Sequence, residues 1–253
     1  MRKVSLDQEK DGGKLIDCIS VENMRQSDAH TIENFIPSLE LMWRAAVGVF
    51  KAVNWKEKNA IVVGAGNNGG DGFALACILK ENGFQCTVFT VGQHLSSDSA
   101  YYARKAEEDG IDIVCFEPNC LKGYDVIVDC LLGTGFQGEL RENYRTAIEA
   151  INRSDSYVVS VDINSGMNGD TGEAQLAVCS DVTVTIGYVK RGLVTENAGT
   201  YIKKLICVDI GIVLIREEDK ICDKQEWEQV NEHSARRYYR CPGWLNMNIL
   251  KAY

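Results

Sequence analysis

Short apolar runs rich in β-branched residues alternate along the middle of the chain with longer segments whose apolar residues recur at helical spacing. The short runs predict buried strands, and the longer segments predict helices. Strands that alternate with helices in this way are typical of a parallel, doubly wound sheet, so we expect an α/β fold. The expected strands are residues 61–63, 85–91, 112–116, 124–132, 157–163, 181–186 and 204–210, and the expected helices are residues 73–80, 97–108 and 141–152.

Two further helices are expected before the first strand. One run at helical spacing precedes Pro37, and a second spans residues 39–53. A proline between two such runs marks the end of one helix and the start of the next. Residues 20–52 therefore predict an N-terminal helical segment that covers the sheet or forms a subunit interface. Farther along, Ser97 or Asp98 is expected to cap the helix that begins there.

Residues 64–72 are the most distinctive stretch of the chain. They contain five glycines, two asparagines and an aspartate, directly after one predicted strand and before a predicted helix. Glycines let the backbone approach a ligand closely, and the unpaired N–H groups at the start of a helix attract anions. A tight turn alone needs far fewer polar residues and glycines. We interpret residues 64–72 as a binding loop.

Two more glycine-rich loops, residues 133–139 and 164–172, follow later strands. All three loops come after the carboxyl ends of predicted strands. Open α/β sheets bind their ligands at that edge, so the three loops are expected to form one site.

Net charge and cysteine spacing exclude several classes of protein. The formal net charge of −9 argues against a general nucleic-acid surface, which normally has a basic excess. None of the ten cysteines forms a CxxC pair, which disfavours a zinc ribbon and a thioredoxin-type site. The first residues lack the apolar core of a signal peptide, and no apolar stretch is long enough to span a bilayer. We expect a reduced, cytoplasmic protein that binds neither nucleic acid nor membrane.

Familiar nucleotide motifs do not fit the chain well. A GxGxxG pattern is present at residues 64–69, but the strand at 85–91 ends without the acidic residue that holds the ribose in dehydrogenases. No P-loop motif is present, and the three histidines lack ligand spacing. Lys190 and Arg191 form a basic pair beside a glycine, which is either a solvated turn, the commoner case, or a contact to a ligand phosphate.

Oxygen-bearing side chains recur where strands end. Asn68, Asp129 and Asp162 occupy such positions, and Ser165 lies close to the last of them. Each aspartate, taken singly, could simply accept backbone N–H bonds from its own turn. Taken together, oxygen ligands from three neighbouring loops suit a hard cation, although the sequence does not distinguish Na⁺, K⁺, Mg²⁺ and Ca²⁺.

With these loops in view, the chain resembles the YjeF N-terminal domain family, the NAD(P)H-hydrate epimerases. The resemblance covers roughly residues 20–215, which leaves a polar segment at 1–19 and an appendage of unknown role at 216–253. It rests on VVGAGNNGGDGFALA at 62–76, VDCLLGTGFQGEL at 128–140, VDINSG at 161–166, DVTVTIGYVKRGL at 181–193 and VDIGI at 208–212.

The resemblance implies a three-layer, α-β-α Rossmann-like sandwich, usually a homodimer. It implies epimerisation of the R and S forms of NADHX or NADPHX, which carry a hydroxyl at C6 of the nicotinamide ring. It also implies that Asn68, Asp129 and Ser165 hold a potassium ion and that Asp162 is catalytic. The substrate-binding residues implied are Asn67, Asn68, Gly69, Gly70, Asp71, Gly133, Thr134, Gly135, Phe136, Gln137, Gly138, Glu139 and Asp162.

The chain departs from the family pattern at three positions. Asn164 replaces a common proline, which bears on the rigidity of the third loop. Trp43 and Ala46 replace a usual Glu or Asn and a usual Gly, at the dimer contact or the pocket rim. Because some relatives fuse a dehydratase that this chain is too short to hold, we expect a separate dehydratase as its functional partner. The alternative function is a non-catalytic nucleotide-binding or scaffold member of the same family.

Overall fold

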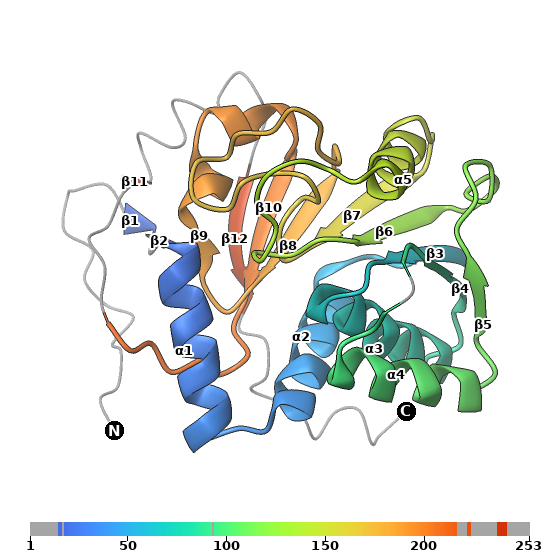
Figure 1. Cartoon of the computed structure of the whole chain (residues 1–253), viewed down its shortest axis with the longest axis horizontal. Coiled ribbons are helices and arrows are strands. Elements are labelled where there is room, and N and C mark those ends of the chain that lie inside the picture. The colour runs from blue at the N-terminus through green and yellow to red at the C-terminus, as the bar shows by residue number, and fades with distance from the viewer. Residues whose placement is uncertain (1–14, 17, 93, 217–221, 224–236, 242–253) are drawn as a thin grey trace.

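The structure is a computed structural model that describes residues 15–16, 18–92, 94–216, 222–223 and 237–241. These residues form an eight-stranded, wholly parallel sheet in the order β12-β10-β8-β7-β6-β3-β4-β5 (Figure 1). The predicted α/β fold is confirmed. Its strands are β3 (Lys58–Val63), β4 (Gln85–Thr90), β5 (Asp112–Cys115), β6 (Val126–Cys130), β7 (Tyr157–Val161), β8 (Val182–Ile186), β10 (Lys204–Val208) and β12 (Arg237–Cys241).

Beside β3, the direction in which successive strands are added to the sheet reverses. From β3 the chain proceeds to β4 and β5 at one edge, then crosses back to β6 on the other side of β3 and continues through β7, β8 and β10. The loops after β3 and β6 therefore diverge at this point. A crevice opens at such a reversal outside the carboxyl ends of the strands, which is where α/β sheets bind ligands.

Helices cover both faces of the sheet. In β3, Ile61 and Val63 pack into the cluster formed with α2, α3 and α4, whereas Ala60 and Val62 pack against α5 on the other face. A strand covered on both sides needs apolar residues at every position, which explains the unbroken apolar runs of the sequence. The helices are α1 (Val21–Asn34), α2 (Ser38–Ala52), α3 (Asn67–Glu81), α4 (Ser97–Glu108) and α5 (Glu142–Asn152).

The element boundaries correct the predictions in three respects. Ser96, and not Ser97 or Asp98, caps α4, because its Oγ accepts a hydrogen bond from the backbone N–H of Ser99. The strands expected at 124–132, 157–163 and 204–210 end earlier, where their last residues turn into loops. Most of the glycine-rich stretch is helical, since α3 begins at residue 67 and not at 73.

Residues before and after the predicted domain at 20–215 also form strands that pair with other strands. Arg237–Cys241 from the predicted appendage adds β12 in parallel beside β10. Two short pairs join β1 (Leu15–Ile16) to β11 (Cys222–Asp223) and β2 (Cys18–Ile19) to β9 (Val189–Lys190). The rest of the expected 216–253 appendage falls, apart from residue 216 and these short strands, outside the described residues, and the domain limits at 20 and 215 stay a prediction. Within the described part of the chain, no helix has the length and hydrophobicity needed to cross a membrane.

Candidate active site

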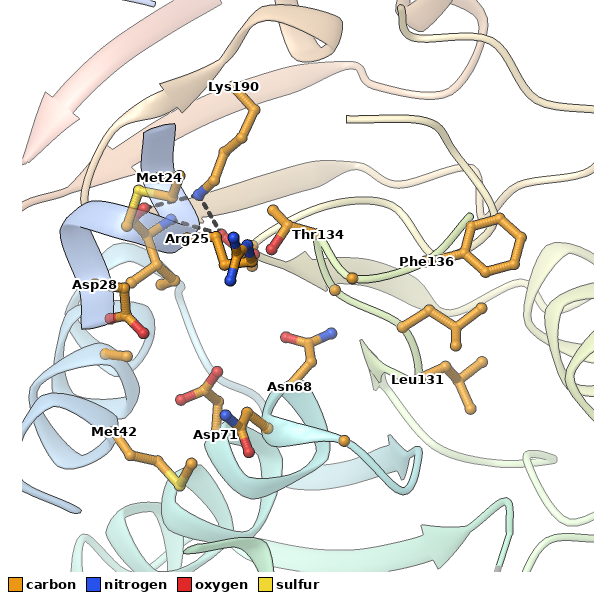
Figure 2. A pocket seen from close by; sticks show the side chains of 18 of the residues that line it. Met24, Arg25, Asp28, Met42, Asn68, Asp71, Leu131, Thr134, Phe136 and Lys190 are labelled. Atoms are coloured by element: carbon orange, nitrogen blue, oxygen red, sulfur yellow. Dashed lines mark hydrogen bonds and ion pairs between the residues drawn. The ribbon is translucent and has the colours of Figure 1, made fainter. Parts of the chain in front are cut away.

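A cavity of about 760 Å³ opens at the carboxyl edge of the sheet, at the reversal of strand order. Helices α1, α2 and α3 form one wall, and the ends of β6, β7 and β8 with their loops form the other (Figure 2). The first and second predicted loops line the cavity, but none of residues 164–172 does, and only Asp162 just before them reaches it. The expectation that all three loops form one site is therefore correct for two of them and wrong for the third. The predicted binding residues that line the cavity are Asn67, Asn68, Asp71, Gly133, Thr134, Gly135, Phe136, Gln137, Glu139 and Asp162.

Three glycines of the first loop serve close packing. A Cβ atom on Gly64 would lie 1.9 Å from the carbonyl oxygen of Leu131, and one on Gly69 would lie 2.1 Å from the carbonyl oxygen of Gly64. On Gly70 it would lie 2.6 Å from the Met42 side chain. Gly69 and Gly70 therefore let α3 approach the strand ends and α2, and neither lines the cavity. Gly138, the other predicted binding glycine outside the lining, has a φ of +90° in its turn.

The first turn of α3 is the part of the stretch that faces the cavity. Gly66 is its N-cap, and the space around a Cβ built there is open. The Oδ1 atom of Asn67 accepts a hydrogen bond of 2.7 Å from Ser96 Oγ, which ties this turn to the start of α4. The N–H groups of a first helical turn lack intrahelical partners and carry the positive end of the helix dipole. This turn is suited to an anionic group.

Asp162 lies directly after β7 in a strained conformation. Its φ is +68°, and among the described residues it is the one non-glycine residue with a positive φ. Its Oδ1 accepts an ion-paired hydrogen bond from Lys190 Nζ and a 3.3 Å bond from the backbone N–H of Ile186. Backbone strain of this kind persists only where surrounding contacts impose it, and it clusters at functional sites.

Lys190 was missed as a site residue, because a solvated turn is the commoner structure for a basic pair. Its side chain is only 1% exposed, at the end of β9. Besides Asp162, its ammonium group donates to Thr185 Oγ1 at 3.1 Å and to the carbonyl oxygen of Ile186 at 2.8 Å. One N–H bond thus goes to the Asp162 carboxylate, and the other two hold the ammonium group in place beside it. Its position beside the apolar Tyr188 and Val189 was the available sequence signal.

Asp129 is fully buried near the end of β6 and does not line the cavity. Its Oδ1 accepts from Ser165 Oγ at 2.5 Å and from the Leu131 backbone N–H at 3.2 Å. Its Oδ2 accepts from Ser160 Oγ and from the Ser165 backbone N–H, both at 2.9 Å. Burial raises the pKa of this carboxyl group above its ordinary value, and the four hydrogen bonds oppose that rise. Asp129 thus joins the end of β6 to the third loop.

Asn68 shows the opposite situation. Its side chain is 7% exposed, yet neither Oδ1 nor Nδ2 has a hydrogen-bond partner within the described residues. The amide points from α3 into the cavity (Figure 2). A buried amide without partners is costly, so such a group indicates a ligand that completes its hydrogen bonds or coordination.

Asp71 and Asp28 add two carboxyl groups to the helical wall of the cavity (Figure 2). Burial raises the pKa of Asp71 well above its ordinary value, and the nearby Asp162 and Asp28 raise it further, while Lys190 opposes them. Burial likewise raises the pKa of Asp28, with a further contribution from Asp162. Asp28 belongs to α1, whose contribution to the site the sequence did not reveal.

The three family departures take well-packed positions. Asn164 donates to the carbonyl oxygen of Val178 at 2.8 Å and accepts from Thr183 Oγ1 at 2.6 Å. These bonds hold the third loop without the rigidity of a proline. Ala46 is fully buried in the core, and Trp43 stacks on Tyr102 with ring centroids 6.2 Å apart. Neither of these two lines the cavity.

Comparison with known proteins identifies the fold and the relatives. A family model described as YjeF-related protein N-terminus matches residues 38–192. The bifunctional NAD(P)H-hydrate repair enzyme Nnr of Coxiella burnetii is 42% identical over 75% of this chain, which spans 40% of that enzyme. An NAD(P)H-hydrate epimerase of Limosilactobacillus fermentum is 38% identical, over 76% of this chain and 95% of its own length.

A solved structure supports the same assignment at the level of the fold. The crystal structure of yeast ynu0, YNL200c, is similar with a TM-score of 0.64 at 20% identity. The similarity covers 70% of this chain and 83% of the yeast chain. The match to the family model, the identity to named epimerases and the conserved architecture agree: this chain belongs to the YjeF-related protein N-terminus family.

Proposed function

We propose that this protein is an NAD(P)H-hydrate epimerase, an isomerase that interconverts the R and S forms of NADHX and NADPHX. The observation that carries the proposal is the cavity itself, where a strained, ion-paired Asp162 faces the first turn of α3 across open space. Relatives that carry the epimerase name match three quarters of the chain. Both observations favour catalysis over a non-catalytic role.

The substrate is a dinucleotide with an anionic pyrophosphate and a hydrated nicotinamide ring. The first turn of α3 provides backbone N–H groups for the pyrophosphate, beside the open space at Gly66. With the pyrophosphate bound there, the nicotinamide ring would lie beside Asp162 and the second loop. Residues 133–137 and 139 of that loop form the wall beside it.

The reaction proceeds by loss and return of water at C6. The lone pair of the ring nitrogen forms a C=N bond as the C6–O bond breaks, so that the hydroxyl leaves as water and the ring becomes a planar cation. Water then adds to the other face of the ring and yields the second epimer. Asp162 exchanges protons with the oxygen at C6, and its negative charge stabilises the cation.

Lys190 is a positioning residue for Asp162. Two of its hydrogen bonds hold the ammonium group, and the third holds Oδ1 of Asp162. Oδ2 is left toward the cavity, where a Cβ on Gly133 would lie 3.7 Å from it. Because the ammonium group is buried, it keeps the carboxylate oriented without competing for the substrate's oxygen.

Potassium fits the residues predicted for it in two respects. The unpartnered Oδ1 of buried Asn68 is an available oxygen ligand. Asp129 is a buried carboxylate whose four hydrogen-bond donors are all neutral, so a monovalent cation offsets its charge. Asn68, Asp129 and Ser165 would hold the ion, which orders the loops. The described residues contain no cluster of His, Cys, Asp and Glu of the kind that binds transition metals.

The remaining features follow from the proposed activity. We propose a homodimer and a cytoplasmic location, where reduced nicotinamide cofactors are handled. A separate NAD(P)H-hydrate dehydratase acts on the S epimer that this enzyme supplies. The bifunctional name of the Coxiella relative, of which this chain spans 40%, supports that functional partnership.

A direct assay tests the proposal. Purified protein with potassium is mixed with R-enriched NADHX, and conversion to the S form is followed by chromatography against the spontaneous background. Wild type should accelerate the conversion, and Asp162→Ala should lower the rate by about 10²–10⁴-fold. The exposed Asp155→Ala serves as the matched control. A wild-type rate equal to background, with dinucleotide binding intact, would establish the non-catalytic alternative.

A further inference from the structure

Asp71 is a carboxyl group of the cavity that the proposed mechanism leaves without a role. It belongs to the second turn of α3, opposite the wall that carries Asp162 and Lys190, and its side chain faces the cavity (Figure 2). It forms no hydrogen bond or ion pair with any described residue. Asp71 is only partly exposed. A carboxyl group that is largely shielded from water and has no partner in the protein is costly, which makes Asp71 a candidate for a role in the site.

The groups that face Asp71 favour its protonated form. Asp28 approaches from α1 and Asp162 from the end of β7, and both disfavour a second negative charge. Lys190 opposes them, but its ammonium group is bound to Asp162. Helix α2 contributes no charged side chain to the lining. The other titratable or charged groups that surround Asp71 or line the same cavity are Arg25 from α1, Cys130 from β6, Asp98 and Tyr102 from α4, Glu139 and Arg141 from the second loop and the residues after it, and Tyr144 from α5.

Epimerisation needs proton carriers on two sides of the ring. The hydroxyl leaves from one face and water adds to the opposite face, so one carboxyl group cannot reach both oxygens. We propose that Asp71 is the second proton carrier of the proposed epimerase: it serves the oxygen on one face of the nicotinamide ring while Asp162 serves the oxygen on the other. This inference rests on the proposed function and names the residue that completes it.

The proton balance closes over one turnover. The Asp71 carboxylic acid gives its proton to the departing C6 hydroxyl, which leaves as water, and the ring nitrogen supplies the electron pair of the new C=N bond. Water attacks C6 from the opposite face and gives its proton to the Asp162 carboxylate, and the C=N electrons return to nitrogen. Solvent in the cavity carries the proton from Asp162 back to Asp71. The reverse reaction uses the two groups in exchanged roles.

The different settings of the two aspartates match these roles. Asp162 is paired with a buried ammonium group, whereas Asp71 has no cationic partner and two acidic neighbours. Opposite environments for two carboxyl groups are how one site provides both an acid and a base at neutral pH. The burial of Asp71 raises its pKa and so keeps its proton available.

Activity measurements on Asp71→Asn test the inference. We expect kcat to fall by about 10²–10⁴-fold in both directions with KM within threefold of wild type, and Asp71→Glu to recover part of the loss. The wild-type rate should decline as pH rises through the pKa of Asp71, and this alkaline decline should vanish in Asp71→Asn. Asp155→Asn, an exposed aspartate, should leave kcat unchanged. A kcat within threefold of wild type for Asp71→Asn, or a persistent alkaline decline, overturns the inference.

A second measurement separates this inference from the proposed function. Carboxyl carbon NMR titration of the unliganded protein, with Asp71→Asn for assignment, reports the ionisation of Asp71 directly. We expect ionisation well above the ordinary aspartate range. Ionisation in the ordinary range overturns the inference even if the protein is an active epimerase. A wild-type rate equal to the spontaneous rate overturns the proposed function, and the catalytic role of Asp71 with it, whatever the titration shows.

Discussion

Asp129 and Asp71 are both enclosed at the carboxyl edge of one sheet, but their surroundings differ completely. Asp129 accepts four hydrogen bonds from neutral donors, whereas Asp71 accepts none from any described residue. The first carboxyl group connects loops, and the second faces the cavity. The difference separates a carboxyl group whose satisfied oxygens hold the fold together from one that is left available for the proposed chemistry.

Removing Asp129 should have the largest effect on stability. Asp129→Ala leaves the N–H groups of Leu131 and Ser165 and the hydroxyl of Ser160 without their acceptor inside the protein. We expect the free energy of unfolding to fall by about 3–5 kcal/mol, measured by urea denaturation. A loss below about 1 kcal/mol would show that the four hydrogen bonds do not hold the loops together.

Lys190→Met breaks the ion pair of Asp162. The surroundings of Asp162 are intermediate between those of Asp129 and Asp71, because it accepts hydrogen bonds but also faces the cavity. Asp162 loses its cationic partner but remains 16% exposed, so water reaches it in part. We therefore expect a smaller loss of about 1–3 kcal/mol in the free energy of unfolding, with a fall in kcat because Asp162 is no longer oriented.

The matched control for this change is Lys203→Met, whose ion pair with Asp181 lies on the surface with the lysine 75% exposed. Its loss should cost less than about 1 kcal/mol and leave kcat unchanged. Equal effects of the two lysine substitutions would mean that burial of Lys190 has no energetic consequence.

Asp71→Asn should stabilise the protein, in contrast to Asp129→Ala. The folded-state pKa of Asp71 lies above its unfolded value, so the folded state favours the proton and ionisation at higher pH opposes folding. Asparagine removes this penalty, and we expect a gain of about 1 kcal/mol at neutral pH. The gain should disappear below pH of about 4, where the carboxyl group is protonated in both states.

The predicted gain in stability is measured by thermal unfolding of wild type and Asp71→Asn across pH 3–8. Asp28→Asn should show a gain of the same sign, because burial raises the pKa of Asp28 as well. A loss of stability in Asp71→Asn at neutral pH would show that Asp71, like Asp129, stabilises the fold, and would contradict the contrast between them.

Removal of potassium should have the smallest effect on the free energy of unfolding. The proposed ion satisfies Asn68 and offsets the charge of Asp129, so exchange of potassium for tetramethylammonium should lower the free energy of unfolding by about 0.5 kcal/mol at moderate salt. Asn68→Ala should eliminate the difference between the two salts, since the amide oxygen is the proposed ligand. Equal stability of wild type in both salts would contradict the proposed site.

Much of the fold could be predicted because parallel strands buried on both faces leave unbroken apolar runs. The runs at β3, β6 and β7 are such segments, and the loops after them were correctly expected at one edge of the sheet. The conformation of the glycine-rich stretch was harder to predict from the sequence. The structure continues α3 through residues 67–72, because helical packing against Gly64 and Met42 overrides the low helix propensity of glycine.

The site was predictable only in part. Asp162 follows a strand, so its place at the sheet edge could be inferred, but its positive φ and its pairing with the buried Lys190 of β9 could not, because they depend on a residue 28 positions farther along the chain. Asp28 lies more than 40 residues before Asp71, and nothing between them in the chain indicates that they face one cavity. Burial and the approach of charges from separate elements are not local properties.

The sequence by itself determined the alternation of strands and helices, the glycines that allow close backbone approach, and the loops that carry oxygen-bearing side chains. These follow from periodicity and from backbone stereochemistry, which act over a few residues. Only the tertiary structure decided that Asp129 is satisfied, that Asp162 is paired with Lys190 and that Asp71 is left alone. The physical reason is that the ionisation and free energy of a carboxyl group depend on water exclusion and on neighbouring charges, which come from segments distant in the chain.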